Sequence, residues 1–202
     1  MTTTLALIAI TCAVSLVAMK QSKMRDALIL WPPAVDNKKE WYRLVSYGLI
    51  HEDFMHLAFN MITLYFFGRV MEEFYNGVLG PFGFAIFYVA ALVASILPSY
   101  QKHRKDAKYY SLGASGAVSA VLFAFILFQP WQLIFVFFLP VPAIVYAVLY
   151  VAYTFYSERQ GGDNINHSAH LWGAAFGVGL TILLEPRVLG VFFEALMNPS
   201  FG

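Results

Sequence analysis

The sequence predicts an all-α polytopic membrane protein, a bundle of six transmembrane helices. Of its 202 residues, 59% are hydrophobic and only 12% are charged, and the mean hydropathy is +0.63. That composition is too apolar for a water-soluble domain of this length. The apolar residues are gathered into runs separated by polar segments, and we expect one membrane-embedded domain covering residues 1–202.

Three spanning helices are expected in the first half of the chain. Residues 2–19 carry no charge and are just long enough to span, and no basic residue precedes them. We therefore expect a retained helix rather than a cleaved signal peptide. A second helix is expected from about residue 51 to 68, and a third from about 78 to 97, where Pro98 helps to end it.

The segment between the first two helices, residues 20–50, is long and basic. It cannot span, but its apolar patch and its aromatic residues Trp31, Trp41 and Tyr42 are typical of the headgroup region. Residues 101–108 form a second charged connection, after the third helix.

Residues 109–156 contain no charge, which is about twice the length that one span needs. The polar break at 129–132 divides them into a fourth helix at 115–128 and a fifth that ends near residue 156. Pro140 and Pro142 should kink or shorten the fifth helix.

A polar loop at 157–166 leads to the sixth helix, residues 167–184. The apolar tail at 188–197 is too short to span and should lie at the interface.

Composition and spacing argue against several other classes of function. The net charge of +1 gives no indication of a nucleic-acid partner, and the single cysteine, Cys12, excludes an intramolecular disulfide. His51 and His56 resemble a zinc-protease motif, but they are five residues apart, about 140° around a helix, instead of four. We expect no metal and no cofactor.

Polar residues recur at the starts of the second, fourth and sixth helices, which alternation places on one side of the membrane. Ionisable groups inside spans are costly and usually functional, so their convergence from three segments indicates a site. The residues are His51, His56 and Asn60, then Ser115, then His167 and His170.

Small residues recur every four positions on the fourth and sixth helices. They are Gly116, Ala120 and Ala124 on the fourth, and Gly173 and Gly177 on the sixth. Such stripes allow close helix contact in lipid. If they face each other, His170 comes close to Ser115, which Gly113 and Gly116 flank.

Together these motifs resemble the rhomboid family of intramembrane serine proteases over about residues 40–184. The matching motifs are Trp41-Tyr42-Arg43, His51, His56-Leu57-Ala58-Phe59-Asn60, Gly68-x-x-x-Glu72, Gly113-Ala114-Ser115-Gly116 and Ala169-His170-Leu171-Trp172-Gly173-x-x-x-Gly177. The resemblance implies a six-helix rhomboid-like core with a Ser-His dyad and no third acid. It also implies that the substrates are single-span membrane proteins with a locally unwound helix.

The resemblance assigns roles to individual residues. Ser115 would be the nucleophile and His170 the general base, while His56, Asn60 and the Ser115 backbone amide would donate hydrogen bonds to the oxyanion. The residues that would support the site are Gly113, Gly116, Gly173, Gly177, Trp41 and Arg43. His51 is expected to organise the start of the second helix, and Glu72 to be a structural partner, for instance of Arg69.

One position departs from the family pattern. The family often has an aromatic residue four positions after the nucleophile, stacked on the base, and here that position is Ser119. Tyr153, Tyr156 and Trp172 are the candidates to replace it, and the sequence does not choose among them. Asp163 is the nearest acid upstream of His170, and we expect it not to act as a third catalytic member.

Two sequence arguments disagree on orientation. The loops beside the expected site carry 11 Lys and Arg residues, and the other side carries 2, which by the positive-inside rule would place the site toward the cytoplasm. The bacterial family pattern would open it to the periplasm, in the inner (cell) membrane, and we follow that pattern. The alternative function is a non-catalytic rhomboid-like membrane chaperone or binding protein, which the presence of both Ser115 and His170 disfavours.

Overall fold

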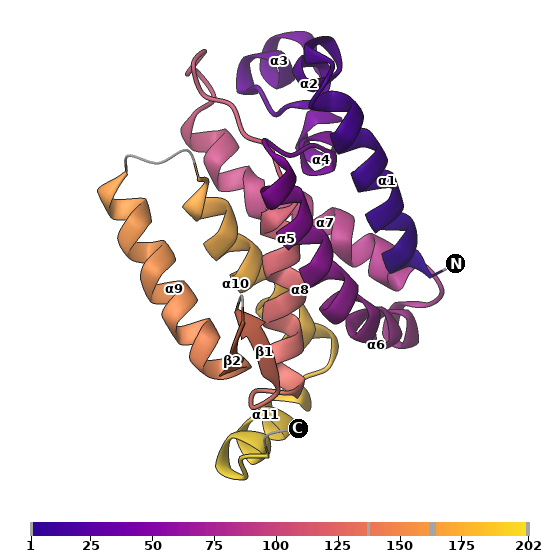
Figure 1. The fold of residues 1–202 in the computed structure, drawn as a ribbon, viewed down its shortest axis with the longest axis vertical. Helices are drawn as coiled ribbons and strands as arrows, with labels where there is room; N and C mark the ends of the chain where they lie inside the picture. The colour runs from indigo at the N-terminus through magenta and orange to yellow at the C-terminus, as the bar shows by residue number, and fades with distance from the viewer. Residues whose placement is uncertain (1, 137, 162–164, 201–202) are drawn as a thin grey trace.

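The computed structural model describes residues 2–136, 138–161 and 165–200, and it is almost entirely helical (Figure 1). The α-helices are α1 (Thr3–Ala18), α2 (Ser22–Leu28), α3 (Pro32–Lys38), α4 (Arg43–Ser46), α5 (Phe54–Thr63), α6 (Arg69–Leu79), α7 (Gly83–Lys102), α8 (Ser115–Phe128), α9 (Ala143–Gln160), α10 (His167–Leu184) and α11 (Val188–Met197). A 3₁₀ turn, η1 (Tyr47–Leu49), precedes α5, and a π-helical segment, η2 (Leu64–Gly68), joins α5 to α6. Strands β1 (Leu133–Val136) and β2 (Leu139–Pro142) form an antiparallel hairpin.

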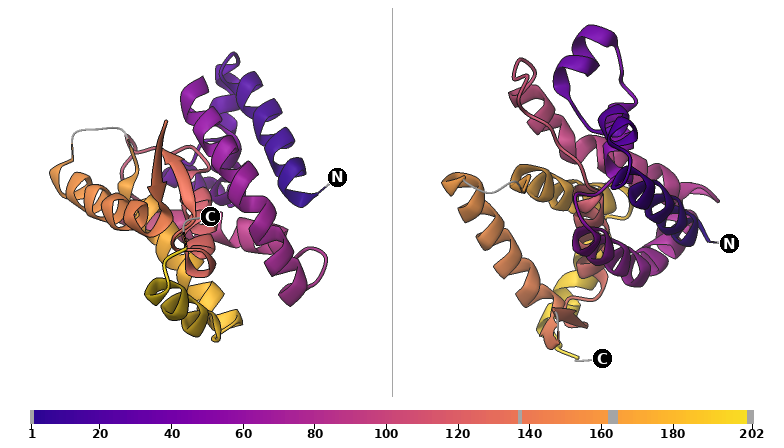
Figure 2. Two further views of the ribbon diagram at one scale, coloured as in Figure 1. Left: turned by 60° about the horizontal axis from the view of Figure 1, so that its bottom comes forward. Right: turned by 45° about the horizontal axis from the view of Figure 1, so that its top comes forward.

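Helix α8 is the centre of the molecule. Every residue from Gly116 to Leu127 is buried, and α10, α7, η2 and α11 pack around it (Figures 1 and 2). Its 14 residues rise only about 21 Å, so neighbouring helices cover its whole length. Among the described helices, α7 and α10 are long and apolar enough to cross a membrane.

Several predicted helix boundaries agree with the structure. The fourth and sixth predicted helices and the apolar tail have the bounds of α8, α10 and α11. The second helix is longer than predicted, because η2 and α6 continue it to Leu79. A π-helical turn of this kind inserts one residue into the helix without ending it.

The prediction that Pro98 helps to end the third helix was wrong. Pro98 lies inside α7, which continues to Lys102. A proline removes one backbone hydrogen bond and bends a helix, but it does not stop a helix that is packed on both sides of the bend. Ile96, Ser99 and Tyr100, on either side of Pro98, are all buried.

The hairpin was not predicted from the sequence. Pro140 and Pro142 lie in β2, opposite Phe135 and Leu133, and α9 begins immediately afterwards at Ala143. Neither proline has an N–H to donate, so both suit an edge strand of a two-stranded ribbon. The prolines therefore shorten the fifth helix by preceding it, and they do not kink it.

Glu72 holds the start of α1. Its carboxylate accepts hydrogen bonds from the backbone amides of Thr3 at 2.6 Å and Thr4 at 2.8 Å. These are among the amides that a helix N-terminus leaves unpaired, and a negative charge there also favours the helix dipole. The suggested pairing with Arg69 was wrong, because Arg69 bonds to the hydroxyl of Tyr65 instead.

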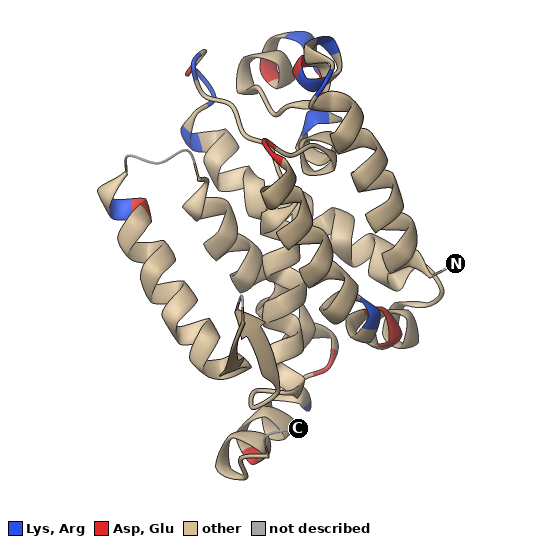
Figure 3. Ribbon diagram, in the orientation of Figure 1, with Lys and Arg blue, Asp and Glu red and all other residues tan. Residues whose placement is uncertain are grey.

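The charged residues are distributed unevenly between the two ends of the molecule. Lys and Arg gather around α2, α3 and the end of α7, whereas few lie at the opposite end (Figure 3). The start of α8 and the start of α10 lie toward the basic end, so the residues expected to form the site are near these charged loops.

Candidate active site

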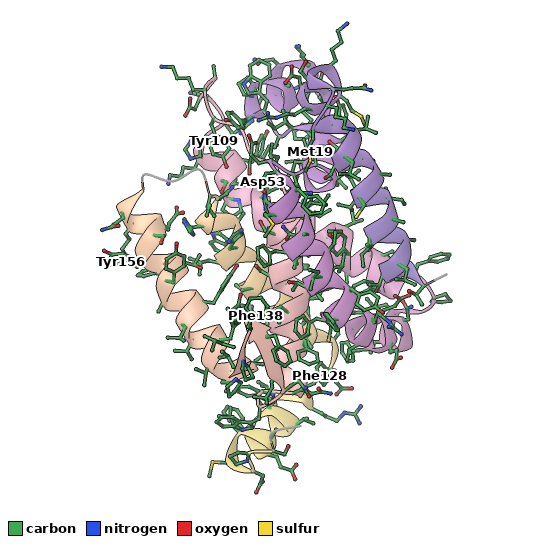
Figure 4. The ribbon with its side chains drawn as sticks, in the orientation of Figure 1. Met19, Asp53, Tyr109, Phe128, Phe138 and Tyr156 are labelled. Atoms are coloured by element: carbon green, nitrogen blue, oxygen red, sulfur yellow. The ribbon has the colours of Figure 1, made fainter. Side chains whose placement is uncertain are left out.

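Ser115 and His170 lie together where two helices begin. The Oγ of Ser115, the first residue of α8, is 2.6 Å from Nε2 of His170, in the first turn of α10. Figure 4 locates this end of the molecule through Asp53 and Tyr109, which both lie there, whereas Phe128 at the far end of α8 lies opposite. The pair has the geometry of a hydroxyl and the base that accepts its proton.

Glycines let α8 and α10 approach closely enough for this contact. A Cβ on Gly173 would overlap the backbone carbonyl of Gly116, and a Cβ on Gly177 would overlap that of Ala120. A Cβ on Gly116 would in turn overlap the hydroxyl of Ser95 on α7. The two small-residue stripes therefore face each other, as the spacing predicts, and backbone touches backbone between the helices.

Gly113 shapes the turn that leads into Ser115. Its φ of +114° is strained for any residue with a side chain, and a Cβ there would lie 2.7 Å from Cε1 of His56. Glycine is thus required twice, once for the backbone angle and once for the space that the His56 ring occupies. This contact brings His56 beside the turn that carries Ser115.

His51 connects three segments around that turn. Its Nδ1 is 2.9 Å from Oγ of Ser15, and its Nε2 accepts the backbone N–H of Ala114 at 3.3 Å. Because the Ser15 hydroxyl donates to the carbonyl of Leu49, the hydrogen between Ser15 and His51 belongs to Nδ1. The His51 ring also packs edge-on against His56, at 4.9 Å between centroids. These contacts place His51 between α1, the turn before α8 and His56, which is the organising position expected for it.

Asn60 follows His56 by one turn on α5. It is buried, and one of its amide hydrogens is donated to the carbonyl of His56 at 2.9 Å. An amide has two N–H donors, so a second remains for an incoming oxygen. Asp53 caps the N-terminus of α5, and its side chain accepts the amide of His56 and so fixes the first turn that carries this residue.

The connection between α1 and α5 supports the turn before Ser115 from the other side. The carbonyl of Tyr47 accepts the amide of Gly113 at 2.9 Å, and Leu30 pairs with Ser111 through two backbone hydrogen bonds. Arg43 is buried and donates to Glu40 and to the carbonyls of Asp26 and Ile29, which closes this connection on itself.

Trp41, which the sequence grouped with Arg43, is half exposed on the outer surface. The two residues of the motif therefore differ in environment, because the side chain of Arg43 is buried and that of Trp41 is at the surface.

Asn166 joins α10 to its surroundings and was missed in the sequence. Its Oδ1 accepts from the amide of Ala169 and the hydroxyl of Ser99, and its Nδ2 donates to Tyr109 and Ser111. The residue before a predicted helix start is a preferred position for an asparagine cap, and that preference could have identified it. Four hydrogen bonds from one side chain fix the turn that carries His170.

Tyr150 provides the aromatic contact to His170, and none of the three candidates does. Its ring lies nearly parallel to the imidazole, with 21° between planes and 6.1 Å between centroids, and its hydroxyl is 2.8 Å from Oγ of Ser119. Tyr153 packs on His167 instead, while Tyr156 and Trp172 are exposed. The missed indication is the helical spacing of residues 143, 147, 150 and 154 on α9, of which 143, 147 and 154 are buried and 150 is partly buried.

Asp36 links the two charged loops at the basic end of the molecule. Its carboxylate accepts two hydrogen bonds from Arg104, each at 2.9 Å, and a short one from the Tyr100 hydroxyl. These donors, Arg104 first, lower the pKa of Asp36 to about 2.

Within the described residues no group of three His, Cys, Asp or Glu side chains is placed to hold a metal ion. Asp163 lies outside the described residues.

The comparison of the sequence with protein families decides which family these features belong to. A family model described as a rhomboid domain matches residues 38–187. The chain belongs to the rhomboid family. A rhomboid domain is a polytopic membrane fold, so the protein is an integral membrane protein. The matched segment includes Ser115, His170, His51, His56 and Asn60, whereas Ser15 and Leu30, which support the turn before Ser115, lie ahead of it.

Curated rhomboid proteins resemble the chain over most of its length. "RHOMBOID-like protein 12, mitochondrial" of Arabidopsis thaliana is 32% identical over 156 residues, 70% of this chain and 46% of that protein. "Putative rhomboid protease YdcA" of Bacillus subtilis is 27% identical over 165 residues, 78% of this chain and 77% of that protein. "Rhomboid protease GluP" of the same organism is 27% identical over 160 residues, 79% of this chain and 29% of that protein. The chain spans about half the length of the Arabidopsis relative and less of GluP.

Proposed function

We propose that this rhomboid protein is an intramembrane serine endopeptidase that cleaves membrane proteins within or beside their spanning helices. The observation that carries the proposal is the 2.6 Å approach of Ser115 Oγ to His170 Nε2 at the start of two closely packed helices. Two of its relatives are named as rhomboid proteases, one of them as putative, which supports the same reaction class. Serine and histidine in contact at a shared, partly buried site are what nucleophilic catalysis of acyl transfer requires.

The proposed reaction has two halves. Ser115 Oγ forms a bond to the carbonyl carbon of the scissile peptide while its proton passes to His170 Nε2. The C–N bond then breaks, and the imidazolium gives that proton to the departing amine. In the second half water loses a proton to His170 and attacks the ester, and Ser115 recovers a proton as the carboxylic acid leaves.

The negative oxygen formed in each half needs donors that are already in place. The proposed donors are the side chains of His56 and Asn60 and the backbone amide of Ser115. The last of these is an unpaired amide of the first turn of α8, where the helix dipole adds positive potential. The network of Ser15, His51 and Gly113 would keep His56 at this position during the reaction.

The proposed substrates are proteins with a single spanning helix. The proposed enzyme is one six-helix domain that covers residues 1–202. A helix hides its carbonyls in its own hydrogen bonds, so a substrate segment must unwind locally before Ser115 can reach one. Helix α9 is the side from which such a segment would approach, because most of its residues are exposed and it lies at the edge of the bundle (Figures 1 and 2). The proposed location is the inner (cell) membrane of a bacterium, with the site open to the periplasm.

The test uses purified protein in liposomes with a model single-span substrate, and a fluorophosphonate probe that labels reactive serines. Ser115→Ala should abolish both cleavage and labelling, and His170→Ala should abolish cleavage, because each removes a partner of the 2.6 Å contact. Ser22→Ala, a substitution in the exposed first residue of α2, is the matched control and should behave as the parent.

Unchanged thermal unfolding of the variants is required for this interpretation. If Ser115→Ala cleaves at the parental rate, the assignment of the nucleophile is wrong. A folded parent that binds spanning segments, cleaves none and takes no label would instead be the non-catalytic chaperone or binding protein.

A further inference from the structure

Tyr150 is the residue from which a further role can be inferred, because it contacts the site from outside the two helices that form it. It lies on α9, while Ser115 begins α8 and His170 belongs to α10. Its ring lies nearly parallel to that of His170, and its hydroxyl bonds to Ser119. One side chain thus touches both helices of the site, one through its ring and the other through its hydroxyl.

Ser119 explains why the ring comes from another helix. It follows Ser115 by four residues, so both lie on one face of α8. A serine side chain at that position is too short to cover the imidazole. Its hydroxyl instead bonds to the phenol of Tyr150 at 2.8 Å, which holds the Tyr150 ring against His170. Phe123, one further turn along α8, also packs against the Tyr150 ring, at 5.6 Å between centroids.

The helix that carries Tyr150 is attached less firmly than the helices it touches. Ala143, Ala147 and Thr154 are its buried residues, whereas Val148 and Leu149 are both more than 60% exposed. Small residues make up its buried face on either side of Tyr150. Tyr153 contacts α10 through His167, whereas Tyr150 contacts both α8, at Ser119 and Phe123, and α10, at His170. If α9 moves outward, the contact to His170 and the bond to Ser119 are lost together.

We propose that Tyr150 is a positioning residue for His170, and that the base is correctly oriented only while α9 is docked against α8. This proposal rests on the proposed function, because it assigns Tyr150 a role in the same Ser115–His170 reaction. A near-parallel aromatic neighbour within about 4.5–7 Å restricts the rotation of the ring it covers, and it keeps water from that face. The position of α9 therefore controls the catalytic step itself, in addition to access to the site.

The test compares steady-state kinetics of α9 variants on the single-span substrate. Tyr150→Leu should lower kcat by about three- to tenfold with KM changed by less than roughly twofold, because orientation of the base acts on the chemical step. Tyr150→Phe keeps the ring and should restore most of kcat. Tyr156→Leu replaces an exposed tyrosine of the same helix and should match the parent.

Two further variants separate the ring from the helix that carries it. Ser119→Phe combined with Tyr150→Leu moves the aromatic ring onto α8 and should recover kcat relative to Tyr150→Leu alone. Ala147→Leu adds bulk to the buried face of α9 and should push α9 outward, lowering kcat while Tyr150 is still present. Its effect should be less than additive with that of Tyr150→Leu, because both remove the same contact.

The outcomes distinguish this proposal from the proposed function. If Ser115→Ala abolishes cleavage but Tyr150→Leu keeps the parental kcat, the protease assignment stands and the positioning role is overturned. A rise in KM alone in Tyr150→Leu would assign the residue to substrate binding and would also overturn it. If cleavage does not depend on Ser115, the proposed function fails first, whatever Tyr150→Leu does.

Discussion

Helices α8 and α9 both contact the α10 helix that carries His170, but they do so in different ways. The contact of α8 is made by backbone against backbone, at Gly116 with Gly173 and at Ala120 with Gly177. The contact of α9 is made by side chains, among them Tyr150 against His170 and Tyr153 against His167. Helix α8 is buried along almost its whole length, whereas most of α9 is exposed.

The α8–α10 contact is therefore rigid, whereas the contact of α9 with α10 can change. A backbone contact has no rotamers, so the separation of the backbones that carry Ser115 and His170 is set by the fold, while the orientation of the His170 ring is not. A side-chain contact can open by rotation or by movement of the helix, at a cost of only a few interactions. The helices that carry Ser115 and His170 therefore form the rigid contact, and the Tyr150 ring beside His170 belongs to the movable one.

The largest expected effect comes from forcing the rigid contact apart. Gly173→Ala places a methyl group where the carbonyl of Gly116 lies, so α8 and α10 must separate. Overpacking of this kind destabilises a protein by about 1–3 kcal/mol, and a shift of about 1 Å between catalytic groups lowers the rate roughly a hundredfold. Cleavage assays and thermal unfolding in detergent would measure both effects.

Gly179 on the same helix supplies the matched control. A Cβ there would meet no atom within 4 Å, so Gly179→Ala should keep full activity and gain up to about 1 kcal/mol from helix propensity. Equal behaviour of the two variants would show that backbone contact does not set the geometry of the site.

A smaller effect is expected from equal truncations on the two helices. Val121 on α8 is fully buried, whereas Val148 on α9 is 63% exposed. Val121→Ala should destabilise the protein by about 1–2 kcal/mol, because the cavity it leaves loses packing contacts on all sides. Val148→Ala should change the unfolding midpoint little, and a comparable loss from both would mean that α9 is packed as firmly as α8.

The smallest effect is expected from acid, which acts on the ion pair between Asp36 of α3 and Arg104, just after α7. The pKa of Asp36 is lowered to about 2 by Arg104 and Tyr100, so the unfolded chain binds this proton more tightly than the folded chain does. The interaction of the Asp36 carboxylate with Arg104 and Tyr100 therefore contributes fully to the stability of the fold above about pH 4. That contribution is lost as the pH falls through about 2. From pH 5 to 9 its contribution should stay constant.

Asp36→Asn tests this point. Its unfolding midpoint should lie no more than a few degrees below that of the parent at neutral pH, since the carboxylate is near the surface, and the difference should disappear near pH 2. A difference that grows on acidification would contradict the assigned sign.

Local pattern in the sequence was sufficient to predict α8, α10 and α11 and the contact between the first two of them. The uncharged runs predict α8 and α10 with their observed bounds, because a helix in lipid must satisfy its own backbone and so is visible as an apolar run. The four-residue spacing of small residues predicts that these helices touch, and hence that His170 approaches Ser115. These features depend on neighbours within one helix turn, which a single sequence contains.

The tertiary structure alone decided which distant side chains complete the site. Tyr150 rather than Tyr153, Tyr156 or Trp172 reaches His170, because the rotation of α9 about its axis is set by packing against α8 and not by its own composition. The hydrogen bond between Ser15 and His51 joins residues 36 positions apart, and the one between Ser99 and Asn166 joins residues 67 positions apart. The hairpin before α9 likewise depends on pairing between strands, which an apolar run does not distinguish from a helix.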